Sequence, residues 1–288
     1  MIGFIGLGVM GEPICRHLVQ KSGQKVCAFD ISHEALERAA KFGAEPLGSV
    51  REVAEKSDIV FLSLPGGKEV KLVAAGPGSL LIKLRAGGYI VDLSTTPVAL
   101  VRELRERFSA RGIHFVDAPV ARTREAAEKG SLSCMVGGTE AEFQRMKPLL
   151  AHFASDVTHC GAAGAGQAMK LLNNMILFQN VVAIAEAITV VRKIGIDPAL
   201  ALEVLSKGSA DSFALRNHAV KSMLPGDFPE KAFSVEYARK DIGYFLQLAK
   251  QLQLDLTGAK NARAVLDKAS AAGLGHEYYP ALLKVIGQ

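Results

Sequence analysis

A glycine-rich turn between two apolar segments opens the chain, and it limits the available folds more than any other feature. Residues 1–5 predict a buried strand, residues 6–11 read GLGVMG, and residues 25–29 predict a second strand that ends at Asp30. A helix to about Ser22 is expected between them. Strand, turn, helix, strand and acid together predict a βαβ unit of a parallel sheet.

This unit has the chemistry of a dinucleotide site. Gly6 permits a tight turn, Gly8 lets a pyrophosphate approach the backbone, and Gly11 lets the helix pack close to the strand. The helix N-terminus offers free N–H groups to phosphate. A merely structural glycine turn is the alternative, and the surrounding strands and acid argue against it. We therefore expect a dinucleotide to contact Gly6, Leu7, Gly8, Val9, Met10, Gly11 and Asp30.

The acid after the second strand bears on the choice between NAD and NADP. The Asp30 carboxylate can accept hydrogen bonds from a ribose 2′-hydroxyl, and it repels a 2′-phosphate. The next residues, Ile31 and Ser32, supply no arginine that would hold a phosphate. NAD is therefore the expected cofactor, and NADP is less favoured.

Strand and helix signals alternate as far as Gly161. Capping-box patterns at 49–52 and 139–142 predict helix starts, and further strands are expected at 59–63, 89–93, 114–118, 132–136 and 157–160. This alternation predicts a mostly parallel, doubly wound α/β sheet of Rossmann type. Ligands of such sheets bind beyond the carboxyl ends of the strands. Loops at those ends should bring these residues near the cofactor or substrate: Leu64, Pro65, Ser94, Thr95 and Arg122.

The pattern changes after Gly161. Apolar residues recur at helical spacing and no strand pattern returns. Helices are expected from 198 onward, at 213–223, 235–252 and 259–272, and from 277 onward. We therefore predict two domains, a dinucleotide-binding domain at residues 1–161 and an all-helical domain at residues 162–288.

The segment GAAGAGQAMKLLNN, at the domain boundary, leads into a long helix. No glycine or proline occurs from Gln167 to Lys193, which predicts a helix of roughly 40 Å. Lys170, Asn173 and Asn174 fall on one face through their i, i+3 and i+4 spacing. Two interpretations stay open from these residues alone: a proton donor with positioning partners, or a lysine that extends to the surface beside two exposed amides.

Composition argues against several classes of function. The formal net charge of +5 is spread along the chain without a basic run, so we expect a small anionic substrate and no nucleic acid. The seven histidines lack HxxxH or HxH spacing, and no metal site is expected. The four cysteines form no CxxC pair, which predicts free thiols in a reducing compartment, the cytoplasm. The most apolar run, 175–188, is interrupted by polar residues and predicts a buried helix rather than a membrane span.

Four blocks of this sequence carry a family resemblance: FIGLGVMGEP at 4–13, DLSTTP at 92–97, FVDAPV at 115–120 with KGSL at 129–132, and GAAGAGQAMKLLNN at 161–174. Together they resemble the β-hydroxyacid dehydrogenase family, typified by 3-hydroxyisobutyrate dehydrogenase. A fifth block, ARKD, stands at 238–241. The resemblance implies NAD(P)-dependent hydride transfer between a small 3-hydroxy acid and its aldehyde or ketone. It also implies a helical domain for substrate binding and dimerisation, and assembly as a homodimer or homotetramer.

The resemblance also implies roles for single residues. Lys170 matches the lysine that acts as catalytic acid or base in the family. Asn174 matches the asparagine that holds the substrate, and Thr95 matches the threonine that contacts the nicotinamide region. Lys240 matches a lysine that lies near the cofactor.

Two departures from the family pattern stand out. DLSTTP has one residue fewer before its proline than the usual DxSTxxP, so the loop shape there is open. The serine and two glycines that usually follow DAPV are replaced by Ala121, Arg122 and Thr123. An arginine fork grips two oxygens of an oxyanion, and the Arg-Thr pair is similar to the loop of sulfolactaldehyde reductases. We expect Arg122 and Thr123 to bind a strongly anionic head group, such as a sulfonate; alternatively, Arg122 pairs with a nearby acid such as Glu125.

The sequence also offers further candidate residues and alternative functions. Ser212 and Phe213, in GSADSF, are candidates for substrate binding. The alternative is that Ser212 is an ordinary loop serine and Phe213 a core phenylalanine. The alternative activities are a sulfolactaldehyde or succinic-semialdehyde-type reductase, an imine reductase, and 6-phosphogluconate dehydrogenase, whose helical domain is larger. A non-catalytic dinucleotide-binding module is the alternative from another class. Lys170 argues against that module and against an imine reductase, because both usually lack the lysine.

Overall fold

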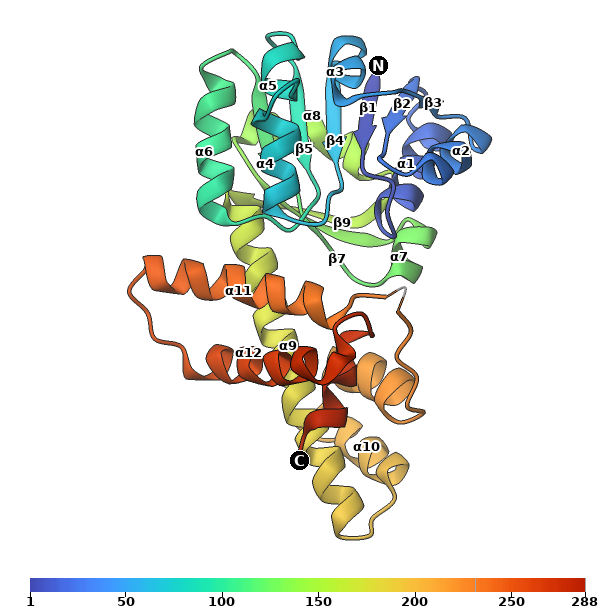
Figure 1. Cartoon of the computed structure of the whole chain (residues 1–288), viewed down its shortest axis with the longest axis vertical. Coiled ribbons are helices and arrows are strands. Elements are labelled where there is room, and N and C mark those ends of the chain that lie inside the picture. Colours follow the sequence, from blue (N-terminus) through green and yellow to red (C-terminus); the bar gives the residue numbers. More distant parts are fainter. Residues whose placement is uncertain (231, 288) are drawn as a thin grey trace. The chain divides into compact units, whose positions relative to one another are not determined.

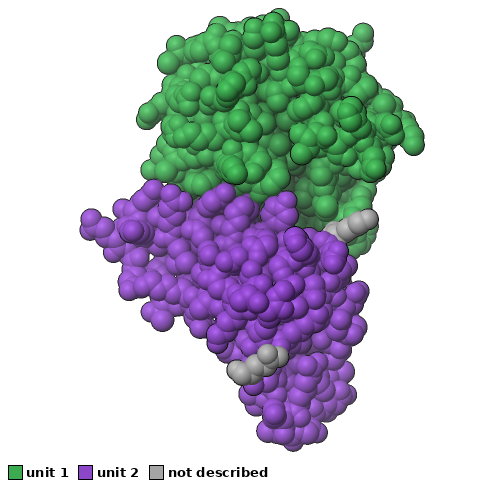
Figure 2. Space-filling view, in the orientation of Figure 1, with its two compact units in different colours: residues 1–170 green, residues 171–288 purple. Residues whose placement is uncertain are grey.

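The computed structural model describes residues 1–230 and 232–287, and the chain divides into two compact units (Figures 1 and 2). Unit 1 comprises Met1–Lys170, and unit 2 comprises Leu171–Gln288. The division falls inside the long helix α9, Ala165–Lys193, whose first residues belong to unit 1. Unit 1 carries the sheet, and the described elements of unit 2 are helices.

One nine-stranded sheet forms the centre of unit 1. Its order is β3-β2-β1-β4-β5-β6-β8-β7, and β9 pairs with β8. All pairs from β3 to β6 are parallel, whereas β8 runs antiparallel to β6 and β7. The predicted doubly wound, mostly parallel sheet is therefore confirmed. The strands are β1 Ile2–Ile5, β2 Val26–Phe29, β3 Glu45–Pro46, β4 Ile59–Leu62, β5 Tyr89–Asp92, β6 His114–Asp117, β7 Val120–Ala121, β8 Leu132–Gly137 and β9 Ala154–Gly161.

Helices cover both faces of the sheet, because successive strand residues point to opposite sides. Phe4 and Phe61 face the core under α1, α2, α7 and α8, whereas the next residues, Ile5 and Leu62, face α3, α4, α5 and α6. The result is a three-layer α/β/α arrangement (Figure 1). The helices are α1 Gly11–Lys21, α2 His33–Lys41, α3 Val50–Lys56, α4 Gly67–Ala75, α5 Leu80–Lys83, α6 Val98–Ser109, α7 Arg124–Lys129 and α8 Glu140–Leu150.

The two capping-box patterns start helices as predicted. The Ser49 hydroxyl accepts the N–H of Glu52 at 3.2 Å and starts α3. Thr139 and Glu142 form a reciprocal capping box at the start of α8. The short helices α2, α4, α5 and α7 and the strands β3 and β7 were not predicted. A strand of two residues, such as β3, is too short to show an alternating pattern.

Unit 2 continues α9 and adds six shorter elements among its described residues. Asp197 caps α10 by accepting the N–H of Ala199 at 3.1 Å, as its position before Pro198 predicts. The helix predicted at 213–223 is present but has i+5 hydrogen bonding, so it is wider than an α-helix. The elements are α10 Pro198–Ser206, η1 Ala214–Met223, α11 Val235–Gln251, α12 Thr257–Ala269, η2 Ser270–Leu274 and η3 Tyr279–Val285.

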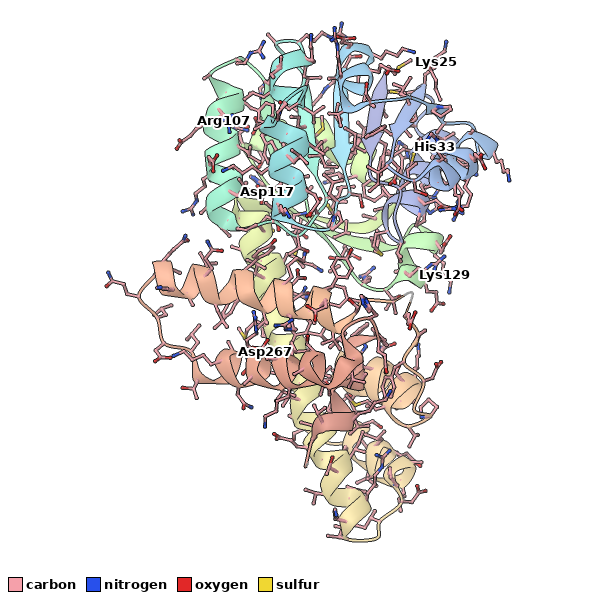
Figure 3. The ribbon with its side chains drawn as sticks, in the orientation of Figure 1. Lys25, His33, Arg107, Asp117, Lys129 and Asp267 are labelled. Carbon is pink, nitrogen blue, oxygen red and sulfur yellow. The ribbon has the colours of Figure 1, made fainter. Side chains whose placement is uncertain are left out.

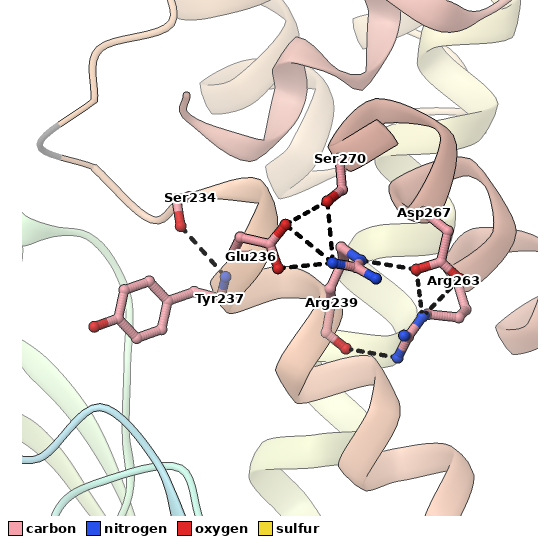
Figure 4. Close-up of polar contacts among 7 residues, drawn as sticks. All are labelled: Ser234, Glu236, Tyr237, Arg239, Arg263, Asp267 and Ser270. Carbon is pink, nitrogen blue, oxygen red and sulfur yellow. Dashed lines mark hydrogen bonds and ion pairs between the residues drawn. The ribbon is translucent and has the colours of Figure 1, made fainter. Parts of the chain in front are cut away.

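A charged network joins α11 to α12 (Figure 4). The Arg239 guanidinium donates to Asp267 at 2.7 Å and to Glu236 at 2.7 Å. Arg263 also donates to Asp267, at 2.8 Å, and to the Arg239 carbonyl oxygen at 3.1 Å. Ser270 contacts both Glu236 and Arg239. The network fixes how α11 and α12, which are both partly exposed to solvent, are aligned along each other. None of the predicted site residues belongs to the network.

Helix α9 is long and apolar enough to span a membrane by length and composition alone, although core helices meet the same criterion. The prediction of a buried helix is only partly correct. Leu171, Phe178 and Val181 are buried, whereas Ile176 and Val190 are more than half exposed. Within the described part of the chain, one side of α9 therefore packs against other residues, and apolar residues on its other sides contact solvent.

Candidate active site

The glycine turn after β1 has the shape that its sequence predicts. Gly6 has a φ of +97°, and a Cβ there would lie 2.2 Å from the Ser63 carbonyl oxygen. A Cβ on Gly11 would lie 2.0 Å from the Gly6 carbonyl oxygen. A Cβ on Gly8 would meet nothing within 4 Å. Gly6 and Gly11 are thus required by backbone packing, while Gly8 leaves its backbone open to a ligand.

Asp30 stands next to this turn at the end of β2. Its Oδ2 accepts the N–H of Leu7 at 2.6 Å, and its Oδ1 accepts the N–H of Ser32 at 2.8 Å. A carboxylate has about four acceptor positions, so capacity for ribose hydroxyls remains. Helix α1 begins without a side-chain cap from Met10. The open Gly8 backbone, the uncapped helix start and the acid fit the pyrophosphate and ribose of a dinucleotide.

The loops after β4 and β5 are tied together by hydrogen bonds. The Leu64 N–H donates to the Ser94 hydroxyl at 2.9 Å, and Pro65 follows directly. The Ser94 N–H donates to Asp92 Oδ1 at 3.0 Å, and the Thr96 hydroxyl donates to Asp92 Oδ2 at 2.7 Å. Thr95 lies between these anchored residues and is the one residue of 91–96 that is not buried. The shortened DLSTTP loop is therefore well anchored, and it presents Thr95.

Asp92 is fully buried at the end of β5. Burial raises its pKa to about 6, although hydrogen bonds from Thr96 and Ser94 oppose the shift. Burial also raises the pKa of Asp117, at the end of β6. Two buried carboxyls with raised pKa values thus support the loops at this edge of the sheet.

Asp117 anchors the start of α9 to the sheet (Figure 3). Its Oδ1 accepts the N–H of Gly164 at 2.7 Å, and its Oδ2 accepts the N–H of Gln167 at 2.8 Å. A Cβ on Gly166 would lie 2.3 Å from the Met135 carbonyl oxygen. The glycines before Lys170 therefore let α9 begin directly against β6 and β8.

Lys170 is half-buried on α9, one helical turn after Gln167. Asn173 and Asn174 follow on the same helix, Asn173 exposed and Asn174 buried. The Asn174 amide donates to Asp241 Oδ2 at 2.7 Å, and its own oxygen accepts from Asn173 at 3.0 Å. Only Asn173 is therefore an exposed amide. The buried Asp241 carboxylate fixes the orientation of the Asn174 amide.

Lys240 precedes that carboxylate on α11. Its ammonium lies 2.9 Å from Asp241 Oδ1. It also lies 5.5 Å from the ring centre of Tyr237 and 5.3 Å from that of Tyr244. The ion pair and the two aromatic faces hold Lys240 in one place. Within unit 2, the structure thus brings Asn174, Asp241 and Lys240 into one cluster.

Arg122 has a local partner, and it is not Glu125. Its guanidinium donates to Asp156 at 2.7 Å, to the Ser155 hydroxyl at 2.7 Å and to the Ser131 carbonyl oxygen at 2.6 Å. The ion pair is exposed, and the backbone φ of Arg122 is +88°. Glu125 instead pairs with Lys129. The alternative that Arg122 pairs with a nearby acid is therefore confirmed, but the acid is Asp156 of β9 rather than Glu125.

Three other predicted residues have local structural roles. The Thr123 hydroxyl caps α7 by accepting the N–H of Ala126 at 3.4 Å. The Ser212 hydroxyl accepts the N–H of Leu215 at 3.1 Å, which supports the start of η1. Phe213 is 46% exposed and packs edge-on against His218, so it is not a core phenylalanine.

Sequence reasoning missed Asp92, Asp117, Gln167 and Asp241 as supports of the site. All four are buried. Asp117, Gln167 and Asp241 connect segments far apart in the chain, whereas Asp92 holds Ser94 and Thr96 of its own loop. Asp92 and Asp117 carry one usable signal, because both stand at the end of an apolar strand. Gln167 and Asp241 lie within helices, where nothing in the local pattern reveals their partners.

Two further observations concern sites of other kinds. In the described part of the chain, no group of three or more His, Cys, Asp or Glu side chains is placed to hold a metal ion. A groove in unit 2, lined by Thr189, Arg192, Met223 and neighbouring residues, contains none of the predicted site residues. We therefore do not assign that groove to the reaction.

Comparison with known families covers almost all of the chain. Residues 1–161 match a family described as the NAD binding domain of 6-phosphogluconate dehydrogenase. Residues 164–286 match a family described as the NAD-binding domain of NADP-dependent 3-hydroxyisobutyrate dehydrogenase.

Single proteins are similar over their whole length. The 2-(hydroxymethyl)glutarate dehydrogenase of Eubacterium barkeri is 36% identical over 284 residues, covering 99% of this chain and 94% of that protein. The solved 3-hydroxyisobutyrate dehydrogenase of Mycobacterium tuberculosis, in a structure with L-serine, is 30% identical with a TM-score of 0.90, covering 100% of this chain and 99% of that one. A structure of Psf3 with NADP+ and 2-OPP is 26% identical with a TM-score of 0.89, covering 100% of both chains.

Proposed function

The chain belongs to the β-hydroxyacid dehydrogenase family, and from that premise we propose its substrate, its acid–base residue and its preferred dinucleotide. At the family level it is an NAD(P)-dependent 3-hydroxyacid dehydrogenase. We propose that it interconverts a small 3-hydroxy acid and the corresponding aldehyde or ketone, with Lys170 as the acid or base. The nicotinamide, when bound, supplies or accepts the hydride.

One observation carries this proposal: Lys170 stands one turn into a helix whose start is fixed to the carboxyl end of the sheet. Asp117 and Gln167 make that connection, and Gln167 also reaches the loop that presents Thr95. Ligands of doubly wound sheets bind at this edge. A lysine held there can donate a proton to a carbonyl oxygen in reduction and accept it in oxidation.

Asn174 is proposed to hold the substrate with a fixed amide. Because Asp241 accepts one of its N–H groups, the amide cannot rotate freely, and it offers its remaining polar atoms in a defined direction. Lys240 neutralises the buried Asp241. The cluster would thus present an ordered hydrogen-bonding group to the substrate at little entropic cost.

Arg122 is proposed to favour substrates with a second anionic group. Its guanidinium already holds a carboxylate and is solvent-accessible, so an incoming sulfonate or carboxylate can exchange with Asp156. The Eubacterium barkeri relative is named for 2-(hydroxymethyl)glutarate, which carries two carboxylates. A dicarboxylic hydroxymethyl acid and a C3 sulfonate such as sulfolactaldehyde are therefore the two candidate classes, beside an ordinary 3-hydroxy acid or succinic semialdehyde.

NAD is proposed as the preferred dinucleotide. Asp30 lies against the glycine turn and both its oxygens already accept backbone N–H groups. A 2′-phosphate would meet this carboxylate, whereas ribose hydroxyls can donate to it.

The cellular setting is proposed from the thiols. All four cysteines are free, three of them buried, which supports a reducing compartment such as the cytoplasm.

A substrate panel tests the proposed reaction. Turnover of NAD would be followed at 340 nm with 3-hydroxyisobutyrate, 3-hydroxypropionate, 2-(hydroxymethyl)glutarate, 4-hydroxybutyrate and a C3 hydroxysulfonate. We expect the highest kcat/KM with a substrate that carries two anionic groups. Equal kcat/KM for 3-hydroxyisobutyrate and the dianionic substrates would show that Arg122 does not determine substrate specificity. Binding of NADH without any turnover would favour the non-catalytic module.

A further inference from the structure

We infer that Gln167 is a positioning residue that couples the Thr95 loop to the helix carrying Lys170. This inference rests on the proposed roles of Thr95 and Lys170. Gln167 is fully buried at the start of α9, and its side chain and backbone together contact two separate loops of unit 1.

The side-chain amide of Gln167 bridges both ends of the Thr95 loop. Its Oε1 accepts the N–H of Thr96 at 3.0 Å, and its Nε2 donates to the Ser94 carbonyl oxygen at 2.7 Å. The residues on either side of Thr95 are therefore held by the same amide group. The amide donates and accepts on separate atoms without carrying a charge.

The backbone of Gln167 connects the start of α9 to the end of β6. Its N–H donates to Asp117 Oδ2 at 2.8 Å, and Asp117 also holds Gly164. Lys170 follows one helical turn later, on the same side of the helix as Gln167. The Thr95 loop, the end of β6 and the first turns of α9 thus share one buried connection.

This connection sets the position of Lys170 relative to Thr95. Thr95 is only half-buried and makes none of the anchoring bonds itself, so its place depends on its two neighbours. A misplacement of about 1 Å at such a site costs roughly 100-fold in rate. Loss of the amide should therefore lower kcat more than it weakens dinucleotide binding, because the glycine turn and Asp30 are not part of this network.

The test uses two replacements in the full-length protein. Gln167→Met keeps the length of the side chain and removes both hydrogen bonds. Gln167→Glu keeps the shape, but its ionised form cannot donate to the Ser94 carbonyl oxygen. When protonated, glutamic acid again has one donor and one acceptor. Gln144→Met, at an exposed residue on α8, is the matched control.

Three results are expected. Gln167→Met should lower kcat by roughly 10- to 100-fold, with the Kd for NADH, from its fluorescence, changed less than about threefold. The ratio of the kcat of Gln167→Glu to that of wild type should rise as the pH falls from 8 to 5.5. The corresponding ratio for Gln167→Met should not change with pH. Hydrogen exchange should be faster at residues 93–97 and 164–170 in Gln167→Met, and unchanged in α12.

The exchange measurement keeps the inference separate from the proposed reaction. If wild type turns over no hydroxy acid, the proposed function fails, and hydrogen exchange alone decides whether Gln167 couples the two segments. Unchanged exchange at either segment in Gln167→Met would overturn the coupling. Equal losses of kcat in both variants at every pH would also overturn it, since they would indicate general damage rather than loss of two specific hydrogen bonds.

Discussion

Asp30 is the residue on which the choice of dinucleotide depends. Replacement with serine removes the charge that faces a 2′-phosphate while keeping an acceptor for the Leu7 N–H. We expect Asp30→Ser to lower the ratio of kcat/KM for NAD to that for NADP by at least about tenfold, about 1.4 kcal/mol. Parallel initial-rate assays with both dinucleotides measure this, with Asp227→Ser as an exposed control. An unchanged ratio would remove Asp30 from dinucleotide recognition.

Asp156 competes with the substrate for Arg122 if the proposed role of that arginine is correct. The Ser155 hydroxyl and then the Arg122 guanidinium lower the pKa of Asp156, so the pair is fully charged at neutral pH. We expect Asp156→Asn to lower KM for a dianionic substrate by about threefold. Arg122→Ser should raise KM by roughly 10- to 100-fold, the range for a hydrogen bond to a charged group.

The matched control for that pair is Arg124→Ser, which removes a nearby exposed arginine that pairs with Glu128. KM values are compared for a dianionic and a monoanionic substrate. If both Arg122→Ser and Asp156→Asn leave KM unaltered for each substrate, the ion pair has a structural role and Arg122 does not bind the substrate.

Residues with a local signal were predictable, and residues with distant partners were not. The shape of the glycine turn could be predicted from spacing, because it follows from a backbone path that the sequence itself encodes. The roles of the turn and of Asp30 in dinucleotide binding stay predictions. Asp241 could not, since its partner Asn174 stands on another helix. Arg122 was recognised as unusual, but its partner Asp156 becomes adjacent only when β8 and β9 pair.

At the scale of elements, the loop after β5 depends on a buried carboxyl whose pKa is about 6. The unfolded chain would have the ordinary value near 3.9. Between these values the folded protein binds more protons than the unfolded chain, so the contribution of Asp92 to stability is greatest at low pH. That contribution falls as the pH rises from about 4 to about 6 and is constant above.

Replacement of Asp92 with asparagine should remove this dependence. The Asn oxygen can accept the Ser94 N–H, and its amide can donate to the Thr96 hydroxyl. Relative to wild type, the free energy of unfolding of Asp92→Asn should be roughly 3 kcal/mol higher at pH 8 than at pH 4, because only wild type loses stability over that range. Urea denaturation of both proteins at several pH values measures the difference. A difference that does not vary with pH would show that Asp92 is not the titrating group.

Element type was predictable where the pattern was long. The strands from β1 to β6 that carry apolar runs, and α9 with its unbroken helical pattern, were identified within a few residues. Helix α5 has four residues, about one turn, so it shows no repeating apolar pattern. Both α4 and α5 are fixed by packing on the sheet. The i+5 bonding of η1 left no trace in the sequence that we can identify.

At the scale of the whole molecule, apolar residues exposed on unit 2 bear on assembly. Val190, Ile194, Leu200 and Val204, at the end of α9 and on α10, are each more than half exposed. Apolar surface of this kind often marks an interface, which supports the proposed homodimer or homotetramer. Light scattering should give a mass of at least about twice 30.6 kDa, and Leu200→Glu should lower it. A monomeric wild type would contradict the proposal.

Lys170 is proposed to perform the proton transfer of a dehydrogenase built on this scaffold, and one pair of measurements tests that role. NADH binding and steady-state turnover would be measured for wild type and Lys170→Ala, with Lys193→Ala, at the far end of α9, as the control. Loss of general acid–base catalysis should lower kcat by roughly 100- to 10,000-fold while the Kd for NADH stays within about threefold. A Lys170→Ala protein that keeps the wild-type kcat would show that Lys170 is not the acid or base of the reaction.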